Sequence, residues 1–125
     1  MTIQEALDIT DEMKPNMMSR QLKLKYLTEV EQLIWSEIVM RHVHTPAQAV
    51  KPNYTEDTDA GTVLIVPEPY TKLYPAYLMS MIDWQNQEDA RYGVDRTMYE
   101  NAYEEMSDWW TRTHMPVQRV REFRI

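Results

Sequence analysis

The sequence predicts a mainly α-helical protein: a small bundle of about four helices, a short strand or hairpin near residues 62–66, and an extended C-terminal arm. Apolar residues recur at steps of three and four through most of the 125 residues, which is the period of an amphipathic helix. A mean hydropathy of -0.61 with 43% hydrophobic residues is typical of a folded globular chain. We expect one helical domain over residues 1–116 and a basic arm over residues 117–125.

Two capping residues mark the helices of the first half. Thr2 and Glu5 have the spacing of a capping box, and the helix that they begin should run for about two turns and end before Pro15. We expect Ser19 to cap a second helix that continues to about Arg41. Its apolar stripe consists of Leu24, Leu27, Val30, Ile34 and Ile38.

Residues 45–62 collect prolines, aspartates and a glycine, and this composition predicts a loop. The β-branched run at 62–66, bounded by Gly61 and Pro67, predicts a short strand. A lone strand needs a partner strand, and the sequence offers two candidates: the tail 117–125 and the extended stretch near Tyr54.

The second half predicts two more helices. One should begin near Tyr70, hold Pro75 in its first turn and end with Gly93 in the C′ position. Its apolar arc is wide, so we expect neighbours on two sides. Asp95 should cap the last helix, which should end at His114. One face of it carries Tyr99, Ala102, Tyr103, Met106, Trp109 and Trp110, and the opposite face carries Glu100, Glu104, Glu105 and Asp108.

Composition narrows the function classes. The absence of cysteine excludes disulfides, thiolate zinc sites and cysteine nucleophiles. A net charge of -7 disfavours nucleic-acid binding by the general surface, although residues 116–125 carry three arginines and one acid. The longest aliphatic run, 63–66, is far too short to span a membrane, and the N-terminus has no pattern of a secretory signal. We expect a cytoplasmic chain with no membrane partner.

No group of residues predicts catalysis. His42 and His44 could contribute to a metal site, but nothing indicates the remaining ligands, and histidines are also favoured at a helix end. Asp59 and its acidic neighbours lack the spacing of a calcium loop. We therefore expect no enzyme, no cofactor and no metal.

The sequence instead predicts protein association. Nine of the thirteen aromatic residues lie between Tyr70 and Trp110, and the whole chain has ten methionines. This is more apolar surface than one small core buries easily, and both residue types are enriched at protein interfaces. The tail could be a solvated terminus or a docking arm. The candidate interaction residues are Tyr54, Glu56, Asp57, Trp109, Trp110, Arg119, Arg121, Phe123 and Arg124.

Several dispersed pieces of residues 54–116 resemble, in order and spacing, small proteins encoded in prophages of Gram-positive gut bacteria. They begin with the stretches 54–59 and 64–70. They continue with Leu73-Tyr74, Tyr77-Leu78, Ile82-Asp83-Trp84, Ala90-Arg91-Tyr92 and 112–116. The first fifty residues are similar only in pattern. The chain thus resembles the head–tail connectors, or adaptors, of tailed phages.

The resemblance implies a virion protein assembled in the bacterial cytoplasm. Copies would form a ring between the portal and the tail proteins, and DNA would pass through without sequence-specific binding. Two alternatives stay open: another virion or packaging-associated structural protein, and a prophage regulator that uses Arg112 and the tail arginines on phosphates.

Overall fold

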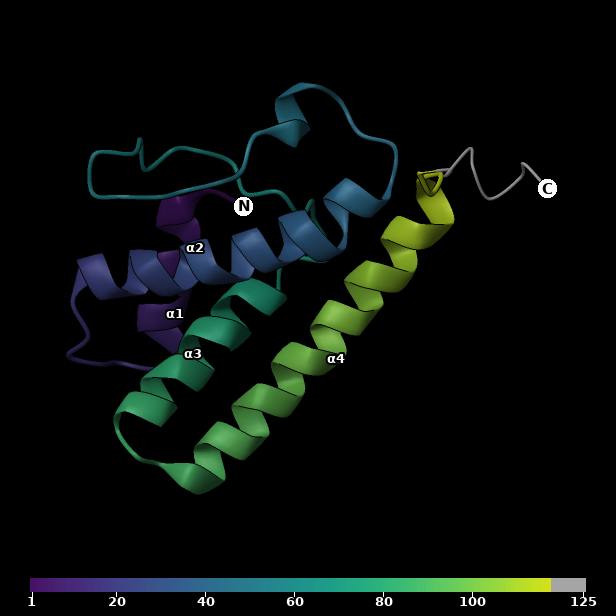
Figure 1. The fold of residues 1–125 in the computed structure, drawn as a ribbon. Coiled ribbons are helices and arrows are strands. Elements are labelled where there is room, and N and C mark those ends of the chain that lie inside the picture. Colours follow the sequence, from purple (N-terminus) through teal and green to yellow (C-terminus); the bar gives the residue numbers. More distant parts are fainter. Residues whose placement is uncertain (118–125) are drawn as a thin grey trace.

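The computed structural model describes residues 1–117, and the last eight residues of the predicted arm lie outside the described part. The prediction of a mainly helical bundle is confirmed (Figure 1). No helix within residues 1–117 has the length and apolar character needed to cross a membrane. The helices are α1 (Ile3–Met13), α2 (Arg20–Glu37), α3 (Leu73–Gln85) and α4 (Asp89–Thr113), with short 3₁₀ helices at Val39–Arg41 and Ala47–Ala49.

The predicted caps of the first two helices are present. The Thr2 hydroxyl accepts a hydrogen bond from the Glu5 backbone N–H at 3.2 Å, and the Glu5 carboxylate accepts one from the Thr2 N–H at 3.3 Å. The Ser19 hydroxyl accepts one from the Leu22 N–H at 3.1 Å. These bonds satisfy N–H groups that have no partner inside a helix. The α-helical part of the second helix ends at Glu37, and a 3₁₀ turn continues it to Arg41, as expected.

The predicted boundary between the last two helices is wrong. The chain turns at residues 86–88, and both Gly93 and Asp95 lie inside α4. Gln87 makes the turn with a φ of 57°, a left-handed conformation in which glycine, asparagine or aspartate is the usual residue. Pro75 lies in the first turn of α3, as predicted, because the first residues of a helix need no N–H donor.

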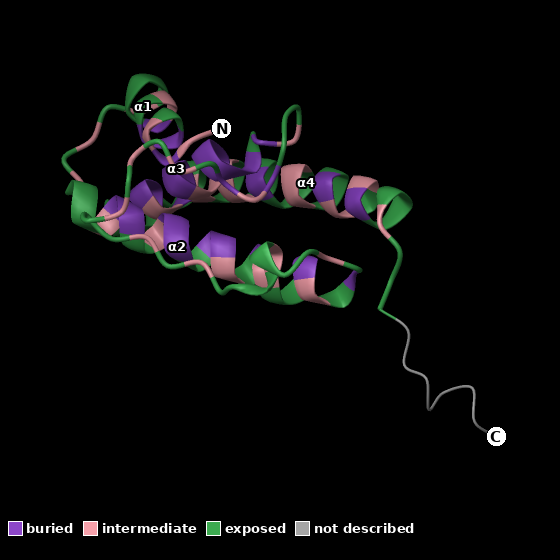
Figure 2. Ribbon diagram, turned by 90° about the horizontal axis from the view of Figure 1, so that it is seen from above, coloured by how far each residue is buried: buried purple, intermediate pink, exposed green. Residues whose placement is uncertain are grey.

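α3 is the centre of the fold. In Figure 2 it lies between α1 and α2, while α4 runs alongside it, and buried residues face inward on each of these helices. Nine of the thirteen residues of α3 are buried, which confirms the neighbours expected from its wide apolar arc. Trp84 differs from its apolar neighbours, because it lies near the end of α3 with 60% of its surface accessible.

The predicted strand at 62–66 is reduced to one bridge. Within residues 1–117 the structure contains no strand; Val63 forms an isolated antiparallel bridge with Thr2, which was neither of the expected partners. The pairing cannot lengthen, because α1 begins at Ile3. Leu64 and Val66 are nevertheless buried in the core, so the segment still closes one side of the bundle.

Candidate functional site

The loop around Tyr54, predicted to be an interaction element, is held on α2. The Thr28 hydroxyl accepts a hydrogen bond from the Tyr54 N–H at 3.0 Å and lies 3.2 Å from the Tyr54 carbonyl oxygen, to which it donates. The Tyr54 phenol donates to the Glu31 carboxylate at 2.7 Å. Both ends of Tyr54 are therefore bound to one helix, which leaves the following residues exposed beside it.

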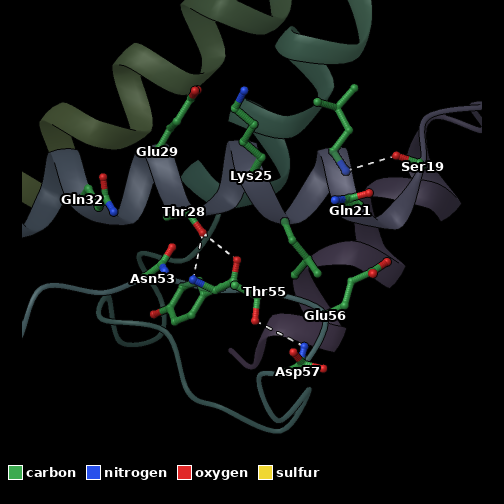
Figure 3. Close-up of a pocket in the computed structure, with 13 residues that line it drawn as sticks. Ser19, Gln21, Lys25, Thr28, Glu29, Gln32, Asn53, Thr55, Glu56 and Asp57 are labelled. Carbon is green, nitrogen blue, oxygen red and sulfur yellow. Dashed lines mark hydrogen bonds between the residues drawn. The ribbon is translucent and has the colours of Figure 1, made fainter.

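A groove of about 660 Å³ lies between α2 and residues 53–57. Figure 3 shows Thr28 reaching from the helix to the loop backbone, with Gln32 and Asn53 near one end and Ser19 near the other. Glu56 and Asp57 line the groove and are exposed. Its walls combine amide, hydroxyl and charged side chains, a composition that suits contact with a polar protein surface.

Behind this groove, Glu31 joins three parts of the chain. Its carboxylate has no exposed surface, and it accepts hydrogen bonds from Tyr54, from the Ile65 backbone N–H at 3.0 Å and from the Tyr74 phenol. Tyr74 in turn accepts a hydrogen bond from the Val66 N–H at 3.0 Å. A single carboxylate on α2 thus holds the loop and α3 together.

Burial has the largest effect on the pKa values of Glu31, Tyr54 and Tyr74. It raises the pKa of Glu31, and the three hydrogen-bond donors oppose that rise because they stabilise the charged carboxylate. The pKa of Tyr54 and that of Tyr74 are also raised, by burial and by the neighbouring negative charge of Glu31. In this network Glu31 accepts three hydrogen bonds, and the Tyr74 phenol both donates to Glu31 and accepts from the Val66 N–H.

The predicted tryptophan pair divides between the core and the surface. Trp109 is half-buried and stacks on Tyr70, with ring centroids 5.1 Å apart. Trp110 is only 3% exposed and stacks on His114 at 4.3 Å. A partner could therefore reach Trp109 in this conformation, whereas the Trp110 side chain belongs to the core.

α4 exposes most of its surface. Only Tyr99, Met106 and Trp110 are buried among its 25 residues. The predicted acidic face is exposed, as expected, and consists of Glu100, Glu104, Glu105 and Asp108. Because α4 packs mainly along α3, this face is open over the second half of the helix.

No family model, curated protein or solved structure matches this chain. The interpretation of the site therefore depends on its own contacts.

A second buried ionic cluster joins the other end of the bundle. Lys14, at the end of α1, forms ion pairs with Asp83 of α3 and, at 2.8 Å, with Asp95 of α4. Asp83 has no exposed side-chain surface, and its Oδ2 has no hydrogen-bond partner among residues 1–117. Burial and the adjacent Asp95 raise the pKa of Asp83 to about 6. Asp95 was expected to be a helix cap, and it serves instead as a tertiary contact.

The two histidines considered as metal ligands, His42 and His44, have structural contacts. His42 is buried, with Nδ1 2.7 Å from the Ile38 carbonyl oxygen, and His44 Nδ1 lies 2.8 Å from the His42 carbonyl oxygen. Within the described part of the chain, no three His, Cys, Asp or Glu residues are grouped so that they could hold a metal ion. The tail candidates Arg119, Arg121, Phe123 and Arg124 lie outside the described residues.

Sequence reasoning missed Glu31 and Asp83, yet each leaves a signal. Glu31 lies four residues after Leu27 and three before Ile34, within the apolar stripe of α2. Asp83 interrupts a helix that is otherwise almost wholly apolar. A carboxylate inside an apolar face indicates a buried group that must have partners.

Proposed function

We propose that this chain is a structural protein of a tailed phage, a head–tail connector whose copies form a ring between the portal and the tail. In such a ring DNA passes through the centre, and the protein carries out no catalysis. The resemblance of residues 54–116 to connector proteins motivates the proposal, and the exposed surfaces of the bundle support it.

The observation that carries the proposal is the one-sided packing of α4. A helix with three buried residues out of 25 has a large surface left for other molecules. A closed ring requires two unlike surfaces on each copy, because each contact joins one face to a different face of the next copy. The acidic face of α4 and the groove beside residues 53–57 are two such surfaces.

The net charge of -7 agrees with this role. An acidic lining repels the phosphate backbone, so DNA can slide past without being held. Glu104 and Glu105 would contribute to such a lining or to the contact between copies, since both are exposed.

Electron microscopy of the purified protein mixed with the portal encoded beside its gene tests the proposal. We expect a ring of this protein on the portal. Glu105→Lys on α4 should weaken ring formation, whereas Glu37→Lys, which makes the same charge change at the exposed last residue of α2, should not. A portal that stays bare at saturating protein concentration would contradict the connector role.

A further inference from the structure

We propose that an apolar groove on the α1 side of the bundle binds residues 118–125 of a second copy. The inference rests on the proposed assembly of copies and adds a further contact between them. Four of the ten methionines of the chain meet in this groove, whose volume is about 320 Å³. Its lining includes Met1, Met13, Met79 and Met98, together with Ile9 and Pro75.

The groove has the character of a docking surface. Met13 is 59% exposed and Met98 is 47% exposed, although both are large apolar residues. Exposed apolar surface gathered in a groove is typical of an interaction site. Methionine side chains are flexible and polarisable, so they can adjust to an aromatic or branched side chain.

Acidic side chains surround this groove. Glu5 and Glu12 lie four residues before and three after Ile9, on adjacent positions of α1, and both are exposed. Glu68 is 65% exposed at its side chain and lies 3.8 Å from the amino group of Met1. Two positive charges belong to the groove lining, on Lys72 and on the amino group of Met1, and the second of them is paired with Glu68. With Glu5, Glu12 and Glu68, the charge around the rim of the groove is negative by one unit.

The composition of residues 118–125 complements both the apolar groove and its acidic rim. They contain Val120, Phe123 and Ile125, which suit an apolar groove, and three arginines with a single acid, Glu122. The arginines would meet the acidic rim while the apolar side chains contact the methionines. DNA or an acidic peptide would not fit this groove, because the acidic side chains around it would repel a negatively charged occupant.

The route of the chain favours a second copy. The Val43 N–H donates to the Met115 carbonyl at 2.7 Å, and the Val117 N–H donates to the Arg41 carbonyl at 3.0 Å. The described chain therefore ends beside the 3₁₀ helix Val39–Arg41, which follows α2. The groove is formed by α1, α3 and α4, and Figure 2 shows α1 and α2 on opposite sides of α3. A contact between unlike surfaces of neighbouring copies is also the kind that closes a ring.

Methyl NMR of methionine-labelled full-length protein tests this contact. We expect the Met13, Met79 and Met98 signals to shift as the protein concentration increases, while Met17, which is fully exposed between α1 and α2, stays constant. The variant Phe123→Ser with Ile125→Ser should lose the shifts. A synthetic peptide of residues 118–125, added to that variant, should restore them.

Variants of the acidic rim test whether its charges contribute to peptide binding. Glu12→Gln should weaken peptide binding by about two- to five-fold, the range expected for an exposed ion pair. Glu29→Gln makes the same change at an exposed position of α2, on the other side of α3, and should leave peptide binding unchanged. Identical spectra of the wild-type protein and the tail variant would overturn the inference. A difference that does not depend on concentration would place the tail in the groove of its own chain and would also overturn it. A portal ring that forms with the tail variant would leave the connector role intact.

Discussion

At the scale of single residues, the fold depends on carboxylates inside apolar faces. Glu31 has no exposed surface and serves as the acceptor for two phenols and one backbone N–H from three segments of the chain. Burial of a charged group is costly unless each lone pair finds a donor, and here the donors are supplied by residues that are distant in sequence. The stability of the bundle should therefore depend strongly on the side chain of Glu31.

Replacing Glu31 with alanine should lower the free energy of unfolding by about 3–5 kcal/mol, because it leaves several buried donors without an acceptor. Urea denaturation followed by circular dichroism measures the change. Glu37→Ala removes an exposed carboxylate from the last residue of the same helix and should alter the stability by roughly 0.5 kcal/mol or less. Equal losses in the two variants would show that the network contributes nothing.

The sequence is enough to place a buried carboxylate such as Glu31 on the apolar face of its helix, but it does not identify the residues that contact it. The register of α2 places Glu31 on the buried stripe, and this much follows from a period of 3.6 residues. Its partner Tyr74 lies 43 residues further along the chain, and Asp95 lies 81 residues from Lys14. Contacts at these separations depend on how the helices pack, which periodicity within each helix does not determine.

At the scale of elements, the helix boundaries were predicted correctly except for the one between α3 and α4. The hydroxyl caps of α1 and α2 are local interactions within four residues, so the sequence is enough to place them. The end of α3 was misplaced because Gly93 and Asp95 have the composition of a helix boundary. The actual turn uses Gln87, which carries no local signal for a left-handed conformation.

The interior position of Gly93 provides a prediction about α4. A side chain added there would meet nothing within 4 Å, so Gly93→Ala should remove conformational freedom from the unfolded chain without a clash. We expect thermal or urea denaturation to show stabilisation by about 0.5–1 kcal/mol.

Gly61→Ala is the matched control. A methyl group there would lie 3.3 Å from Oδ1 of Asp59, which already accepts a hydrogen bond from the Gly61 N–H. This variant should not be stabilised. Destabilisation by Gly93→Ala would contradict the assignment of residue 93 to the interior of a helix.

At the scale of the whole molecule, two buried ionic clusters hold opposite ends of one bundle. Glu31 joins α2 to the loop and α3, and Lys14 joins the end of α1 to α3 and α4. Both clusters contain a carboxyl group whose pKa is raised, chiefly by burial. Such groups take up protons more readily in the folded state than in the unfolded state, so the molecule as a whole should respond to pH.

The last prediction concerns this response. The pKa of Asp83 is raised from its ordinary value of 3.8 to about 6, so within that window the folded state binds more protons than the unfolded state. Stability therefore decreases as the pH rises through the window, by roughly 1–3 kcal/mol for this group. The contribution of Asp95 has the opposite sign but lies below that window, because its pKa is lowered.

Asp83→Asn removes the titrating proton and keeps the shape of the side chain. Urea denaturation across the same pH window should show a flatter dependence for this variant than for the wild-type protein. Asp8→Asn, at an exposed position of α1, should retain the wild-type slope. An Asp83→Asn profile parallel to the wild-type profile would mean that Asp83 stays ionised in the folded protein. The positive charge of Lys14 would then outweigh burial and the neighbouring Asp95 in setting the protonation of the cluster.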